Sequence, residues 1–185
     1  MTQFEFLSVF VSLVLAFGVT DILSNWGEEI RLRNEVRHYW VHSAWSLLLV
    51  IVMIQIWWAL WLLRDRASWT FFEYLCLIVP YLLAAMLAYL LTPKFDDGER
   101  DIRLYYYDNS SWFFTLAACY IGTWMLFAYI VSGEGFFDPG SIMRYLGIGL
   151  MLALASWKNE YFHALAVVAA YLLLTFWIGT QVFRL

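Results

Sequence analysis

The chain has 185 residues, of which 63% are hydrophobic, 21% aromatic and only 14% charged. Soluble domains are roughly 45–50% apolar and about 25% charged, so this composition excludes a soluble globular fold. The net charge of -4, without a large basic patch, argues against a nucleic-acid partner.

The apolar segments predict an all-α integral membrane protein with about six transmembrane helices, short loops and one transmembrane domain over 1–185. Each helix needs about 20 apolar residues to cross the hydrocarbon core, which leaves no room for an extramembrane domain. The first segment lacks the basic start and the cleavage site of a signal peptide and is expected to be retained. The predicted helices cover 4–23, 35–63, 71–91, 112–131, 142–157 and 161–182.

Two of these predicted helices and one loop carry further expectations. The second, from Glu35 to Leu63, is predicted to be the longest helix and to project into the headgroups. The stretch 92–111 is predicted to be the longest loop. The fifth segment is only about 16 residues long, so it either thins the bilayer locally or forms a re-entrant or tilted interfacial segment.

Basic residues in short loops predict the orientation, because such residues favour the cytoplasmic side. The larger group is Arg31, Arg33, Arg37, Lys94, Arg100, Arg103 and Lys158. The smaller group is Arg64, Arg66, Arg144 and Arg184. This bias predicts that both termini lie outside.

The first predicted helix carries a stripe of small residues at a spacing of four, which lets another helix backbone approach closely. Its members are Ser8, Ser12, Ala16, Thr20 and Ser24. The partner is either another helix of the same chain or a second copy of the chain.

Two polar residues inside apolar segments need a physical reason. Asp21 lies two residues before the end of the first segment, and a carboxylate at that depth requires water or a partner. Gln55 lies near the middle of the second segment, where an amide either hydrogen-bonds across helices or lines a path.

A short pattern, basic-Asn-Glu-x-x-His, begins at Arg33 and again at Lys158. Helix capping by Asn explains it, and a parallel duplication of helix pairs is the alternative. It places His38 and His163 at one predicted depth, with His42 four residues after His38 on the same helix face. Glu35, Glu160 and Asp21 belong to the same expected layer.

Three imidazoles and three carboxylates in one layer could bind a metal, relay protons or form a pH-dependent switch. The weak metal candidates are His38, His42 and His163, and a solvated layer of unrelated residues is the alternative. Bis-histidine haem is a minor alternative, and the expectation is no cofactor. The chain lacks the motifs of hydrolases, NTPases and c-type haem proteins, so enzymatic activity is not expected.

Three blocks of the sequence together resemble a group of small bacterial inner-membrane proteins with no assigned activity. They are FLSVFVSLVLAFGVTDIL, RHYWVHSAWSLLLVIVMIQIWWALWLL and KNEYFHAL. The resemblance implies the bacterial inner membrane as the location and implies nothing about mechanism.

Together, these features favour a homo-oligomeric, channel- or transporter-like protein. Its polar layer, near the cytoplasmic face, would gate or bind an ion or a proton. The alternatives are a non-catalytic accessory or sensor subunit of a larger membrane complex, and a metal- or haem-binding redox subunit.

Overall fold

The computed structural model describes residues 3–66, 68–95 and 101–181, and the side chains of 176–178, 180 and 181 fall outside that description. Within it the chain is helical and forms no strand. The helices are α1 (Gln3–Arg31), α2 (Trp40–Ala59) with a 3-10 turn η1 (Leu60–Leu63), α3 (Phe71–Leu90), α4 (Ile102–Ser132), α5 (Pro139–Ser156) and α6 (Glu160–Gln181).

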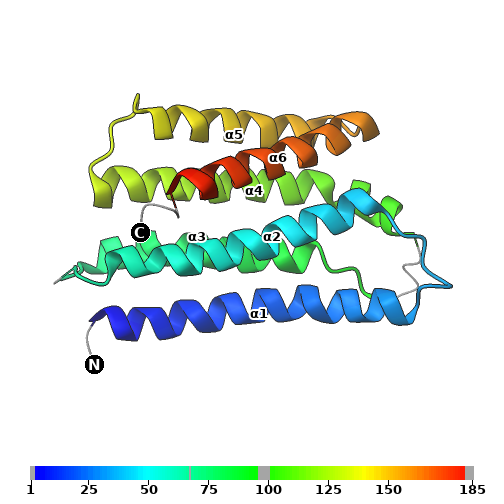
Figure 1. The fold of residues 1–185 in the computed structure, drawn as a ribbon, viewed down its shortest axis with the longest axis horizontal. Coiled ribbons are helices and arrows are strands. Elements are labelled where there is room, and N and C mark those ends of the chain that lie inside the picture. The colour runs from blue at the N-terminus through cyan, green and yellow to red at the C-terminus, as the bar shows by residue number, and fades with distance from the viewer. Residues whose placement is uncertain (1–2, 67, 96–100, 182–185) are drawn as a thin grey trace.

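The six helices run roughly antiparallel along one axis, with α1 at one edge and α5 at the other (Figure 1). The first helix packs mainly on α3, α3 packs on α4, and α4 packs on α5, while α6 lies against α2. The described basic residues of the larger predicted group therefore lie towards one end of the bundle, and Arg64, Arg66 and Arg144 lie towards the other. Arg100 and Arg184 lie outside the described residues.

Four helices of the described chain, α1, α2 with η1, α3 and α4, are long and apolar enough to cross a membrane. The protein is therefore an all-helical membrane protein. The fifth predicted segment forms a continuous helix of 18 residues, α5, which runs beside α4 (Figure 1).

Two of these helices extend well beyond the predicted apolar segments. The first helix has 29 residues and α4 has 31, so they are about 43 and 46 Å long, against a hydrocarbon core of about 30 Å. The predicted long loop 92–111 is wrong, since its last ten residues form the start of α4. Ile102, Tyr106 and Ser110 are buried at a helical spacing there, and the Asp101 carboxylate caps the helix.

The predicted start of the second helix at Glu35 is also wrong, and so is its rank as the longest. Residues 32–36 turn, and the backbone of Arg37 pairs with Asp101 in an isolated bridge that includes the bond from Ile102 N–H to the Arg37 carbonyl. Contact with the start of α4 thus holds this segment extended, and α2 begins only at Trp40. His38 consequently lies outside the helix and shares no helix face with His42.

The two copies of the Asn-Glu pattern therefore adopt different structures. In the second copy the Asn159 side chain accepts a hydrogen bond from Phe162 N–H at the start of α6, as an N-cap does. In the first copy Asn34 lies in a turn before extended backbone. Capping explains only the copy at α6, and the alternative, a structural repeat, is absent at this point of the described chain.

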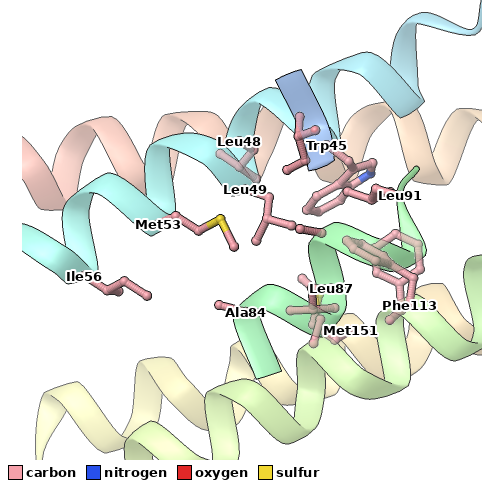
Figure 2. Close-up of a cluster of buried hydrophobic side chains, with 14 of the residues drawn as sticks. Trp45, Leu48, Leu49, Met53, Ile56, Ala84, Leu87, Leu91, Phe113 and Met151 are labelled. Carbon is pink, nitrogen blue, oxygen red and sulfur yellow. The ribbon is translucent and has the colours of Figure 1, made fainter. Parts of the chain in front are cut away.

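One part of the hydrophobic core lies where α2, α3, α4 and α5 meet. Figure 2 shows side chains of α2 directed at the second half of α3, with the labelled Phe113 of α4 and Met151 of α5 beside them. The labelled members are Trp45, Leu48, Leu49, Met53, Ile56, Ala84, Leu87, Leu91, Phe113 and Met151.

The closest approach between helices that a glycine permits lies at Gly18, on the buried face of α1. A Cβ atom there would lie 2.5 Å from Met53 Cε, 3.2 Å from Ala85 Cα and 3.3 Å from Ala88 Cβ. The Met53 methyl can move, whereas the backbone of α3 cannot move without a change in helix packing. The absence of a side chain at Gly18 therefore sets the distance between α1 and α3.

We expect Gly18→Leu to destabilise the protein by about 1–3 kcal/mol, because overpacking forces α1 away from α3. Gly27 in the same helix is the matched control, since nothing lies within 4 Å of a Cβ there. Gly27→Leu should be neutral or stabilise by up to about 1 kcal/mol through helix propensity. Reversible unfolding in detergent measures both, and equal effects of the two variants would contradict the close approach.

Candidate functional site

Tyrosine and histidine side chains gather at the end of the bundle where α2, α4 and α6 begin. We call Tyr39, His42, Tyr105, Tyr106, Tyr107 and His163 the tyrosine–histidine cluster. Tyr39 precedes α2, His42 lies in its first turn, the three adjacent tyrosines lie at the start of α4, and His163 lies at the start of α6. These helix ends lie opposite the N-terminus (Figure 1).

His163 is fully buried, and protein groups occupy both of its ring nitrogens. Its Nε2 lies 2.9 Å from the Trp157 carbonyl, and its Nδ1 lies 2.7 Å from the Tyr106 hydroxyl. A carbonyl only accepts, so Nε2–H donates to Trp157, and in the neutral ring Nδ1 accepts from Tyr106 O–H. His163 therefore fastens the connection between α5 and α6 to α4.

His42 is also buried, but only one of its nitrogens has a protein partner. Its Nε2 lies 2.9 Å from the Leu91 carbonyl, and therefore Nε2–H donates. The Nδ1 atom has no hydrogen-bond partner among the described residues. The Tyr106 ring lies between the two histidines, with its centroid 6.4 Å from that of His42 and 5.5 Å from that of His163.

A second pair in the cluster joins the segment before α2 to α4. The hydroxyls of Tyr39 and Tyr107 lie 2.9 Å apart. Burial, followed by the hydrogen bond with Tyr107, raises the pKa of Tyr39 well above its usual range. This phenol therefore stays protonated at physiological pH and available as a hydrogen-bond donor.

Three backbone carbonyls at and just after the end of α3 accept hydrogen bonds from side chains of three other helices. The Leu90 carbonyl accepts from Tyr105 O–H at 3.1 Å, and the Leu91 carbonyl accepts from His42. Beyond them, the Pro93 carbonyl accepts from Asn25 Nδ2 at 3.0 Å. The last carbonyls of a helix have no partners within it, so α4, α2 and α1 supply the missing donors.

Charged residues surround the cluster at the same end of the bundle. Glu29 of α1 is buried, and its Oε2 lies 3.3 Å from Nδ1 of the half-exposed His38, while its Oε1 has no partner among the described residues. Glu160 pairs with Arg103 at 2.6 Å, which joins α6 to α4 at the surface. Exposed pairs of this kind contribute roughly 0–1 kcal/mol, so they add little to the stability.

The predicted layer is therefore only partly assembled. His42 and His163 meet around Tyr106, whereas His38 contacts Glu29. Asp21 lies exposed on the outer face of α1, and Glu35 is exposed in the turn after α1. Gln55 is half-buried on α2, and its side chain makes no hydrogen bond with the described residues.

The small-residue stripe of α1 does not coincide with the face that the helix buries. That buried face consists of Leu7, Val11, Leu15, Gly18, Ile22, Asn25 and Glu29. Within the stripe, Ser12 accepts a hydrogen bond from the Trp57 indole at 3.0 Å, and Ser8 bonds to the Glu5 carbonyl. Ala16, Thr20 and Ser24 are exposed.

The space at the cluster limits what it can bind. Among the described residues no three His, Cys, Asp or Glu side chains are grouped to hold a metal ion. The cavity beside His42 has a volume of about 10 Å³. A larger hollow, of about 510 Å³, lies between the starts of α1 and α3, at the opposite end. The cluster thus fits a water molecule and is too small for a haem or an organic substrate.

Several residues of this site escaped the prediction. Asn25, Glu29 and the three adjacent tyrosines fell in stretches assigned to loops, since those stretches are too polar for hydrocarbon. The available signal in the sequence was the run of three tyrosines at 105–107, with Ile102 and Ser110 four residues on either side of Tyr106. No family model, curated protein or solved structure matches the chain.

We expect Tyr106→Phe to destabilise the protein by about 1–3 kcal/mol, because it leaves the buried His163 Nδ1 without its donor. Tyr161, which is 87% exposed and lies two residues before His163 in α6, is the matched control. Tyr161→Phe should change the stability by less than about 0.5 kcal/mol. Thermal and denaturant unfolding in the same detergent compares the two variants. An unchanged free energy of unfolding in Tyr106→Phe would contradict the structural role of His163.

Proposed function

We propose that the protein is a homo-oligomeric, channel- or transporter-like protein of the bacterial inner membrane, in which Asp21 faces the shared interior of the assembly. The observation that carries the proposal is the position of Asp21 on the outer face of α1. It lies there beside Thr20 and Ser24, on a surface otherwise made of large apolar side chains such as Phe17 and Leu23.

The depth of Asp21 follows from its neighbours along α1. Gly18 lies beside Ala85 and Ala88 of α3, and Asn25 bonds to the Pro93 carbonyl. Asp21 is therefore level with the last turn of α3, near the edge of the hydrocarbon. A lipid-facing carboxylate at that depth costs on the order of 1–3 kcal/mol, which assembly around water would relieve.

In this proposal the histidines have separate roles. His42 and His163 donate to backbone carbonyls and hold the helix ends together, so they serve as support. Asp21 and the half-exposed His38 are two of the accessible titratable members at this end. They are our candidates for contact with an ion or proton.

We expect Asp21→Ala to weaken self-association about tenfold or more, which corresponds to about 1.4 kcal/mol. The variant removes the polar group that lipid solvates poorly. Native mass spectrometry from nanodiscs gives the oligomer distribution, and pH-sensitive dye in proteoliposomes gives the proton flux. Asp65→Ala is the control, since Asp65 is 84% exposed and lies after η1.

Unchanged oligomer distribution and unchanged flux in Asp21→Ala would overturn the proposal. A monomer that copurifies with a stable, unrelated membrane partner would favour the second class, an accessory or sensor subunit. In that case the exposed face of α1 would contact a helix of the partner.

The topology proposed with this function has six spans, with α5 and α6 crossing beside the other four and both termini outside. The antiparallel order of the six helices and the distribution of basic residues support it. Bilayer thinning around α5 accommodates its length of about 27 Å, from 18 residues.

Single cysteines placed in a background without Cys76 and Cys119 test this topology. In intact spheroplasts, an impermeant maleimide should label Ser68→Cys and Gly135→Cys. It should label Asn34→Cys and Lys158→Cys only after permeabilisation. Labelling of Lys158→Cys in intact spheroplasts would show that α5 does not cross, and reversed labelling of all four would reverse the orientation.

A further inference from the structure

The cavity beside His42 combines a small volume with an unpaired buried acceptor. His42 is 1% exposed, its Nε2–H is committed to the Leu91 carbonyl, and its Nδ1 has no partner among the described residues. In the neutral ring the Nδ1 atom carries a lone pair and no hydrogen, so it can only accept. Whatever pairs with it must donate a hydrogen bond.

None of the polar side chains that line this cavity donates to His42 Nδ1 in the described structure. The Ser110 hydroxyl gives its only hydrogen to the Tyr107 carbonyl at 2.9 Å. The Asn109 amide donates to the Tyr105 carbonyl at 3.0 Å. The Ser110 oxygen keeps lone pairs that can accept, so the cavity presents a second acceptor beside His42.

We infer that one water molecule occupies this cavity, donates to His42 Nδ1 and gives its second hydrogen to Ser110 Oγ. The cavity of about 10 Å³ matches the roughly 10–15 Å³ that one water requires. The site lies between α2, α3 and α4, and the water joins α2 to α4. It goes beyond the proposed function, because it requires neither an oligomer nor transport.

His163 provides an internal control within the same protein. Both histidines donate from Nε2 to a backbone carbonyl, but Nδ1 of His163 already accepts from the Tyr106 hydroxyl. The two rings thus share a tautomer and a buried environment. They differ in whether a protein hydroxyl or a water molecule donates a hydrogen bond to Nδ1.

Solid-state NMR of the ¹⁵N-histidine-labelled protein in lipid bilayers tests the inference. The signals are assigned with His38→Gln and His42→Gln variants, and the buffer contains no ammonium, which would also act as a pure donor. We expect both buried histidines in the Nε2–H form, with rapid magnetisation transfer from water to His42 Nδ1 and at least threefold slower transfer to His163 Nδ1.

Two variants separate the water from a general change in the fold. Ser110→Val fills the cavity with two methyl groups and should abolish the transfer to His42 while the His163 signals stay unchanged. If Ser110→Val does not fold, Ser110→Ala takes its place. It removes only the second acceptor and should reduce the transfer to His42. Equal transfer to His42 and His163 in the unmodified protein, or a His42 protonated on Nδ1, would overturn the inference.

Discussion

The need to satisfy backbone carbonyls at helix ends, where water is scarce, organises this protein. The end of α3 carries the clearest case, because donors from α4, α2 and α1 reach the Leu90, Leu91 and Pro93 carbonyls in turn. In hydrocarbon an unpaired carbonyl costs several kcal/mol, so these bonds fix which helices meet and at what height. The tyrosine–histidine cluster follows from this constraint.

The same rule recurs at other helix ends. His163 donates to the Trp157 carbonyl after α5. Near the end of α2, Tyr81 adds a second donor to the Ile56 carbonyl, which also accepts from Leu60 N–H. Tyrosine and histidine suit this task because each combines an apolar ring with one directed polar group. The high aromatic content therefore serves helix-to-helix hydrogen bonding inside the bundle as well as contact with lipid outside it.

The site has buried, hydrogen-bonded histidines in its interior and charged residues at its margin. His42 and His163 are buried among tyrosines, whereas Glu29, His38, Arg103 and Glu160 lie around them. Asp21 is separate from both groups, on the outward face of α1. This separation divides the predicted polar layer into a structural part and an accessible part, and it directs the functional proposal to α1.

The sequence by itself determined the environment, the helical class, the core of each apolar segment and the N-cap at Asn159, since these depend on local hydropathy and capping. Only the tertiary structure decided that α2 starts at Trp40, that α4 reaches back to Ile102, and which tyrosine meets which histidine. Those outcomes depend on pairing between segments far apart in the chain, such as Arg37 with Asp101. Local periodicity carries no information about such partners.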